Sequence, residues 1–258
     1  MLDLNEVYNG NCLDVMKEIE DESVEVILTD LPYGTTAAAW DSVIPFEPMW
    51  EQYNRILKPH GAIVLFSSGK FTPQLIMSNL NCYKYSWVWN KSLLSGFLNA
   101  KYRPMQRTED VCVFSRKKGE RINYYPIMEQ RDKPVKIKYA SGKCSLYKHA
   151  HIECAPEYTH KYPTNVLNFN LSQNNRINPT QKPIELLEYL IKTYSKEGDL
   201  ILDSCSGSGS TCLAAKNINR NYIGIELNKV YYEASLKYIE GCTTREVIKM
   251  FPNLKEQS

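Results

Sequence analysis

Short, continuously apolar runs constrain the fold of this chain more than any other feature. Runs of this kind occupy residues 24–29, 61–66, 85–89, 110–114, 198–203 and 221–226. Strands with one solvated face alternate apolar and polar residues, whereas strands covered on both faces are apolar throughout. Helical patterns separate several of the runs, at 49–57, 73–77, 183–194, 210–216 and 229–239. Alternating strands and helices predict an α/β fold whose sheet is covered on both sides.

Composition narrows the class of protein further. The chain has 258 residues, of which 43% are apolar and 23% charged, as in ordinary globular proteins. Its apolar runs are far shorter than the roughly 20 residues that a membrane span requires. The N-terminus has neither the basic start nor the apolar stretch of a secretory signal. We therefore expect the eight cysteines to be reduced thiols of a cytoplasmic protein.

Periodicity divides the chain into four segments. Residues 1–115 and 179–240 show the strand-and-helix pattern and are predicted to be the two halves of one α/β domain. Residues 116–178 lack clear periodicity and are rich in Lys, Tyr, Asn and Pro, which favours an insert of loops and short strands. Residues 241–258 form a polar C-terminal tail.

Positive charge is concentrated in the insert. Residues 116–178 contain 12 Lys and Arg against 5 Asp and Glu, whereas the formal net charge of the whole chain is only +2. A basic region on a mildly acidic body predicts a polyanionic partner, although a solvated lysine-rich surface has the same composition. The residues that we expect to neutralise phosphates are Arg121, Arg131, Lys133, Lys136, Lys138 and Lys143.

A glycine-rich turn follows the run at 198–203. The stretch LDSCSGSGST places Gly207 and Gly209 between a strand and a helix, where glycine lets the backbone turn tightly and approach a ligand. Glu226 ends the next strand, where acidic residues accept hydrogen bonds from ribose hydroxyls. Cys212 fills the last position of the dinucleotide fingerprint, and the sequence contains no phosphate-binding P-loop motif. The turn therefore favours S-adenosylmethionine over a dinucleotide or ATP.

Three motifs resemble those of the amino-methylating DNA methyltransferases, the N6-adenine/N4-cytosine family. DLPYG at 30–34 resembles their catalytic Asp-Pro-Pro-Tyr, NPTQKP at 178–183 resembles a His-Pro-Thr-Gln-Lys-Pro signature, and LDSCSGSGST followed by GIELN at 224–228 resembles their cofactor motif. The catalytic motif comes first along the chain and the cofactor motif last, which is the circularly permuted order of the β group of that family. The resemblance implies a class I S-adenosylmethionine-dependent methyltransferase fold, Rossmann-like, with a mostly parallel twisted sheet, helices on both faces and an inserted target-recognition region.

The resemblance assigns the chemistry to Asp30, Leu31, Pro32 and Tyr33. An exocyclic amine is a weak nucleophile because its lone pair is delocalised into the base, so acceptors aimed at its N–H bonds favour attack on a methyl group. The Asp30 carboxylate and the Leu31 carbonyl are the predicted acceptors, and Pro32 restricts the backbone around them. Tyr33 offers a face on which a flipped-out base can stack. An ordinary strand-to-loop turn has a similar composition, and the downstream motifs decide against it.

The resemblance also carries over the cofactor-binding positions Asn11, Cys12, Asp30, Thr180, Lys182, Asp203, Ser204, Ser206, Gly207, Gly209 and Glu226. Asn11 stands where the family has an acid and is expected to accept a hydrogen bond from the adenine amine. Lys182 is expected near the carboxylate of the cofactor, although a lysine before a helix is commonly just solvated. The chain departs from the family in having Leu31 for a proline, Ser204 and Cys205 for Pro-Phe, and Asn178 for histidine.

Cysteine and histidine gather in the insert, at Cys144, His149, His151, Cys154 and His160. Their spacing matches no standard zinc motif, so we predict an unliganded loop without metal, with zinc as the alternative. Three alanines at 37–39, natural or engineered, stand in a loop where we expect polar residues.

The sequence thus predicts a DNA methyltransferase that methylates the N6 amine of adenine by base flipping and direct in-line transfer from S-adenosylmethionine. The acid at position 30 favours adenine, because cytosine-directed relatives usually begin the motif with serine, and N4-methylation of cytosine is the alternative. A non-catalytic DNA-binding protein on the same scaffold and methylation of RNA or protein remain open. The predicted partner is double-stranded DNA, with a homodimer and a cognate restriction enzyme as further partners and no membrane.

Overall fold

The computed structural model describes residues 2–35, 41–136, 157–171, 176–178 and 180–256. The chain divides into two compact units, one of residues 1–125 and 165–258 and the other of residues 126–164. The smaller unit lies within the predicted insert, and the flanking parts of that insert belong to the larger unit.

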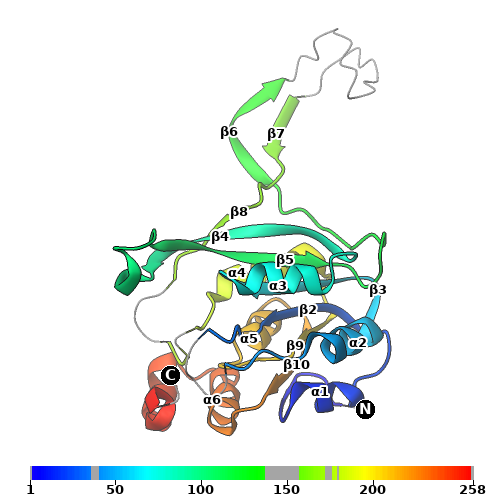
Figure 1. Cartoon of the computed structure of the whole chain (residues 1–258). Coiled ribbons are helices and arrows are strands. Elements are labelled where there is room, and N and C mark those ends of the chain that lie inside the picture. Colours follow the sequence, from blue (N-terminus) through cyan, green and yellow to red (C-terminus); the bar gives the residue numbers. More distant parts are fainter. Residues whose placement is uncertain (1, 36–40, 137–156, 172–175, 179, 257–258) are drawn as a thin grey trace. The chain divides into compact units, whose positions relative to one another are not determined.

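The larger unit is built on one eight-stranded sheet (Figure 1). Its strands in spatial order are β1 (Glu6–Asn9), β10 (Asn221–Glu226), β9 (Leu200–Asp203), β2 (Val24–Asp30), β3 (Leu57–Ser67), β5 (Gln106–Phe114), β4 (Tyr83–Ser95) and β8 (Val166–Asn168). Neighbouring strands of this sheet run parallel, except that β5 is antiparallel to both β3 and β4. The predicted mostly parallel sheet is confirmed.

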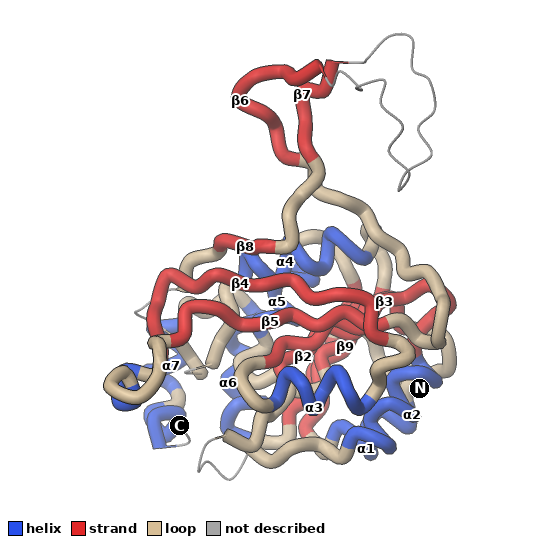
Figure 2. Tube along the Cα trace, turned by 45° about the horizontal axis from the view of Figure 1, so that its top comes forward, coloured by secondary structure: helices blue, strands red, loops and turns tan. Residues whose placement is uncertain are grey.

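Helices cover both faces of this sheet (Figure 2). One layer consists of α4 (Ile184–Tyr194), α5 (Ser210–Asn217) and α6 (Lys229–Glu240), and the other of α1 (Cys12–Val15), the 3-10 helix η1 (Met16–Glu18), α2 (Phe46–Ile56) and α3 (Phe71–Ser78). Alternate residues of β2 separate two cores, because Val26 and Leu28 pack with α4 and α5 whereas Ile27 packs with α2 and α3. The C-terminal α7 (Thr244–Met250) and η3 (Pro252–Glu256) pack against α6.

Some elements differ from the predicted ones because long-range pairing decides their length. The β4–β5 hairpin is longer than the apolar runs at 85–89 and 110–114, since its ladder continues through Asn90 opposite Thr108 to Ser95 opposite Gln106. β1 and β8 are too short to show a periodic pattern, and they form because β10 and β4 offer them parallel partners.

The smaller unit contains a two-stranded ribbon. β6 (Glu129–Lys136) pairs antiparallel with β7 (Glu157–Lys161), with a shift of register between Gln130 and Val135. Lys161 Nζ lies 2.8 Å from Glu129 Oε2, and Arg131 Nε donates to the His160 carbonyl at 3.2 Å. Because an isolated ribbon buries little apolar surface, these polar contacts contribute to its order.

The position of β9 determines where a ligand can bind. From β9 the chain passes through α5 to β10 on one side, whereas β2 lies on the other side. Val26 lies opposite Ile201 and Ile27 opposite Leu202, so β2 and β9 end at the same edge of the sheet. Open α/β sheets bind ligands at the carboxyl ends of their strands, where the strand order reverses. The segments near positions 30 and 207, far apart in sequence, therefore meet at this edge.

Candidate active site

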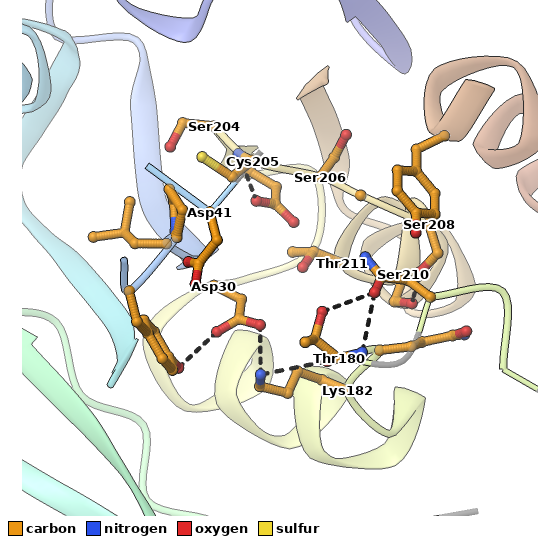
Figure 3. A pocket seen from close by; sticks show the side chains of 18 of the residues that line it. Asp30, Asp41, Thr180, Lys182, Ser204, Cys205, Ser206, Ser208, Ser210 and Thr211 are labelled. Atoms are coloured by element: carbon orange, nitrogen blue, oxygen red, sulfur yellow. Dashed lines mark hydrogen bonds and ion pairs between the residues drawn. The ribbon is translucent and has the colours of Figure 1, made fainter. Parts of the chain in front are cut away.

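A cavity of about 670 Å³ lies at this edge of the sheet. It is lined by residues from each of the three motifs, among them Asp30, Tyr33, Lys182, Asp203, Gly207 and Glu226. Figure 3 shows Asp30 and Lys182 joined by a hydrogen bond, with Ser206 and Ser208 of the glycine-rich loop across the same pocket. The volume is within the roughly 300–1,000 Å³ that is usual for small-molecule pockets.

Asp30 is held from two sides at the end of β2. Tyr33 Oη donates to its Oδ1 at 2.8 Å, and Lys182 Nζ donates to its Oδ2 at 2.5 Å. Burial raises the pKa of the Asp30 carboxyl, and the Lys182 ammonium opposes that rise. The Tyr33 ring stacks on Phe71, with the ring centroids 5.0 Å apart. The carboxylate and the aromatic ring thus hold fixed positions without a ligand.

The turn that follows Asp30 is anchored by a second carboxylate. Asp41 is buried, and its two oxygens accept hydrogen bonds from Gly34 N and Thr35 N, each at 2.8 Å. Leu31, which stands where the family has a proline, is buried in the core beside α2 and α3. We did not predict Asp41 from the sequence, because it lies eleven positions after the motif's acid and beyond the alanines at 37–39.

A row of alternating charges extends from Asp30 into the sheet. Lys182 Nζ lies 3.5 Å from Glu109 Oε2, and Lys91 Nζ lies 2.7 Å from Glu109 Oε1. Burial alone would raise the pKa of Glu109, but the Lys182 and Lys91 ammonium groups hold it below its ordinary value. Burial alone would lower the pKa of Lys182, but Asp30 and Glu109 hold it above its ordinary value. Lys182 is therefore a buried cation between two carboxylates.

The glycine-rich loop takes the backbone shape that its sequence predicts. Gly207 and Gly209 both lie in the left-handed region, with φ of +51° and +77°. A Cβ at Gly209 would stand 2.9 Å from both Ser235 Cβ and Ile239 Cδ1, so this glycine lets the loop approach α6 closely. Glu226 Oε2 accepts a hydrogen bond from Gly207 N at 2.7 Å. The acid at the end of β10 thus fixes the loop at the end of β9.

Two hydroxyl groups in this part of the cavity have no protein partner. Ser206 Oγ and Tyr231 Oη are buried, line the cavity, and have no hydrogen-bond partner among the residues that the structure describes. A buried polar group without a partner is unfavourable, and native proteins rarely keep one unless a ligand or water satisfies it. The cavity therefore fits a ligand with hydrogen-bonding groups near Ser206 and Tyr231.

The comparisons with known proteins agree with this arrangement. A family model described as DNA methylase, of the N6/N4 group, matches residues 24–237. The chain belongs to the N6-adenine/N4-cytosine DNA methylase family. The predicted family is confirmed.

Related proteins include two type II methyltransferases. M1.MboII of Moraxella bovis is 28% identical to this methylase over 250 residues, which cover 90% of this chain and 95% of the relative. M.HpaI of Haemophilus parainfluenzae is 27% identical over 248 residues, which cover 90% of this chain and 73% of the relative.

Solved structures share the fold. The cytosine-N4-specific PvuII DNA methyltransferase is 16% identical, with a TM-score of 0.64 over 98% of this chain and 93% of its own. The complex of M1.HpyAVI with S-adenosylmethionine is 22% identical, with a TM-score of 0.59 over 92% of this chain and 99% of its own. The class I methyltransferase fold that we predict is thereby confirmed.

Four other predicted cofactor positions of this methylase are engaged in the protein itself. Ser204 is buried, and its Oγ is hydrogen-bonded to Tyr53 Oη at 2.6 Å, so it links β9 to α2. Asn11 Oδ1 accepts from Leu13 N at 2.9 Å and caps α1. Thr180 Oγ1 donates to Asn178 Oδ1 at 2.9 Å. The fourth, Asp203, accepts from Cys205 N at 3.2 Å, and burial raises its pKa to about 7. All four line the cavity. Asn178, the partner of Thr180, lies against Gly207, where an added Cβ would be 3.3 Å from Asn178 Nδ2.

Cys12 begins α1 after β1, and Cys205 follows β9. Both residues line the cavity. The Cys205 thiol lowers the pKa of Cys12 through a hydrogen bond, and the same contact raises the pKa of Cys205. Cys12 is buried with α1 and α2, which makes it part of the cavity wall as well as of the core.

The predicted phosphate-binding residues of the methylase are distributed over both units. Arg121 belongs to the larger unit, where its carbonyl lies 3.0 Å from His60 Nδ1. Arg131, Lys133 and Lys136 belong to the smaller unit, on β6. Lys138 and Lys143 lie outside the described residues, as do the alanines at 37–39.

The Cys and His cluster of the insert is described only at His160. Among the described residues, no group of three or more His, Cys, Asp and Glu side chains is placed to hold a metal ion. Within the residues that the structure describes, no helix combines the length and the apolar character that crossing a membrane requires.

Proposed function

We propose that this methylase transfers the methyl group of S-adenosylmethionine to the N6 amine of adenine in double-stranded DNA. The observation that carries the proposal is the place of Asp30, whose carboxylate lies with the Tyr33 ring in the cavity that the Gly207 loop also lines. DNA methylation is the activity of the family, and S-adenosylmethionine is its cofactor. The choice of adenine rests on the acid that begins the motif.

Polar groups of the cavity fit S-adenosylmethionine. Glu226 uses one lone pair on each oxygen for Gly207 N and Asn228 N and keeps others for ribose hydroxyls. The unpartnered hydroxyls of Ser206 and Tyr231 can bond polar groups of the cofactor. The left-handed Gly207 keeps a side chain out of the cavity. When bound, the cofactor supplies an electrophilic methyl group.

The turn after β2 acts on the amine of the base. The Asp30 carboxylate accepts one amine N–H and the Leu31 carbonyl accepts the other, which frees the nitrogen lone pair for attack. Lys182 opposes the rise in the pKa of Asp30 that burial causes, and the raised pKa makes the ionised carboxylate a stronger acceptor than an exposed one. Asp30 is also the base in the cavity that can receive the proton which the methylated amine must lose.

Tyr33 stabilises the extruded base. Because Phe71 covers one face of the Tyr33 ring, the base stacks on the opposite face. Extrusion costs a few kcal/mol, and stacking on an aromatic ring returns roughly 1–3 kcal/mol. The hydrogen bond from Tyr33 Oη to Asp30 keeps the stacking surface and the acceptor in one geometry.

The test is to incubate the protein with unmethylated duplex DNA and cofactor labelled in its methyl group, then to digest the DNA and separate the nucleosides. We expect the label in 6-methyladenine. Label in 4-methylcytosine would show that the target base is cytosine and not adenine. Absence of label from all nucleosides would overturn it, and Asp30→Ala serves as the control that retains DNA binding.

We further propose the partners and location that the sequence predicts. The type II relatives favour a cognate restriction enzyme, and a homodimer is testable by light scattering of the purified protein. The described cysteines Cys12, Cys82, Cys112, Cys205, Cys212 and Cys242 are free thiols, which fits a reducing cytoplasm.

A further inference from the structure

The turn that joins β4 and β5 presents unusually exposed apolar side chains. Phe97, Leu98 and Tyr102 are 77%, 91% and 87% exposed, the highest values among the large apolar residues that the structure describes. Phe97 and Leu98 begin the 3-10 helix η2 (Phe97–Asn99) at the tip of this hairpin. Exposed apolar residues that stand together mark an interaction surface more often than single ones do.

The same turn carries positive charge only. Residues 92–108 contain Lys101, Arg103 and Arg107, all exposed, and no Asp or Glu. A second copy of this chain packed on the turn would bring two clusters of like charge together, which is unfavourable. The combination of cations with apolar and aromatic side chains instead matches nucleic acid, whose phosphates attract the cations and whose bases accept stacked rings.

The turn has an ordered backbone. Gly96 lies in the left-handed region with φ of +86°, and successive bonds join Asn99 N to the Gly96 carbonyl at 3.0 Å and Tyr102 N to the Asn99 carbonyl at 2.9 Å. At the base of the hairpin, Gln106 Nε2 donates to Ser68 Oγ at 2.5 Å. The exposed side chains are therefore presented on a structured support, which reduces the entropy lost on binding.

The turn begins at the wall of the active site. Leu93, Leu94 and Ser95 of β4 line the same cavity as Asp30 and Tyr33, and the chain passes directly from them to Gly96 and Phe97. In Figure 1 the coil that joins β4 and β5 extends past the end of the sheet. A duplex that delivers a base into this cavity would meet the turn beside the extruded nucleotide.

We propose that this turn enters duplex DNA next to the target, with Phe97 and Leu98 filling the space that the extruded base leaves. Lys101 and Arg103 contact the flanking phosphates. Apolar side chains inserted between base steps are a known way to unstack DNA, and their burial offsets part of the cost of extrusion. The inference rests on the proposed function, since it requires that a base leave the helix.

The test compares two duplexes that differ only opposite the target base, one with the normal partner and one with an abasic site. Phe97→Ala/Leu98→Ala is assayed on both, with Met77→Ala as the control, because Met77 is 67% exposed on α3 and does not line the cavity. We expect the double variant to lose roughly 10- to 100-fold in kcat/KM on the paired duplex, as for the loss of one or two stacked groups. On the abasic duplex, where extrusion is already easy, it should come within about threefold of the wild type.

Other outcomes overturn the inference in distinguishable ways. Equal losses on the two duplexes would mean that the turn serves general DNA binding. Unchanged rates on both would mean that it plays no part, and a change in oligomeric state by light scattering would assign it to a second copy of the chain. A thermal melt like that of the wild type excludes misfolding. If the wild type labels no nucleoside in either duplex, the proposed function fails instead.

Discussion

At the end of β2 the Asp30 carboxylate is bonded by Lys182 and Tyr33, whereas the buried hydroxyls of Ser206, after β9, and Tyr231, on α6, have no hydrogen-bond partner among the described residues. Lys182 lies between Asp30 and Glu109 and forms an ion pair with each. Ser206 and Tyr231 leave their half of the site open. On the proposed function, the difference means that the half that handles the base is organised in advance, while the half that holds the cofactor is completed by its ligand. Preorganised acceptors avoid rearrangement during the reaction, which is where electrostatic catalysis gains most.

The largest expected effect is at Asp30. Asp30→Ala removes the charged acceptor, and we expect kcat to fall roughly 100- to 1,000-fold, as when one preorganised group of an active site is removed. Asp30→Asn keeps the shape of the side chain and loses its charge, so it separates the contribution of the charge from that of the hydrogen-bond acceptor. Single-turnover methyl transfer measures the effect, and a rate within threefold of the wild type for both variants would contradict the preorganised clamp.

The next effect concerns the backbone of the cofactor loop. Gly209→Ala places a methyl group against Ser235 and Ile239, whereas Gly198→Ala meets nothing within 4 Å although its φ of +83° is similar. Both variants should lose about 1–2 kcal/mol of unfolding free energy from the left-handed backbone. Gly209→Ala should lose about 1–3 kcal/mol more from overpacking. Denaturant unfolding measures both, and equal losses would show that the close approach to α6 is unimportant.

The charges beside Asp30 should shift the pH profile in opposite directions. Asp30 must be ionised, so activity falls as the pH drops through its pKa. The Lys182 ammonium lowers that pKa and the Glu109 carboxylate raises it. Lys182→Gln should therefore move the acidic limb of kcat/KM to higher pH, and Glu109→Gln should move it to lower pH. If the acidic limbs of the two variants shift in the same direction, or do not shift, Lys182 and Glu109 do not set the pKa of Asp30.

The smallest effect is at the open half of the site. Tyr231→Phe removes a hydroxyl that has no hydrogen-bond partner among the described residues, so it should leave the stability of the ligand-free protein unchanged or slightly higher and weaken cofactor binding about three- to tenfold. Tyr53→Phe removes a hydroxyl bonded to Ser204 and should lower the stability of the ligand-free protein instead. Thermal melts and calorimetric titration with S-adenosylmethionine distinguish them. A Tyr231→Phe variant that is destabilised but binds the cofactor normally would contradict the proposed contact between Tyr231 and the cofactor.

Local signals were sufficient where chemistry demands an unusual sequence. Gly207 and Gly209 take left-handed backbone that few other residues tolerate, so the loop is visible as a motif. The Asp30 turn has the composition of an ordinary strand-to-loop turn, so it was recognised only together with the downstream motifs.

Residues brought in by pairing across the sheet were not predicted. Glu109 on β5 contacts Lys182, and Lys91 reaches Glu109 because β4 pairs with β5 in the observed register. The one sequence signal was an acid at the start of the apolar run at 110–114. Tyr231 lies on a helix face like any core residue, and only its unpartnered hydroxyl in the cavity distinguishes it.

The boundaries of the smaller unit have an evolutionary consequence. Tyr125 N donates to the Thr193 carbonyl at 2.8 Å, and Val88 N donates to the Asn165 carbonyl at 2.8 Å, so both junctions are pinned to elements of the larger unit. Recombination that exchanges the segment between those two junctions would leave the sheet, its cores and the methyl-transfer residues intact. On the prediction that the insert at 116–178 recognises the target, a lineage built this way acquires new modification patterns by trading one cassette, while the fold that carries Asp30 and the glycine-rich loop is inherited unchanged.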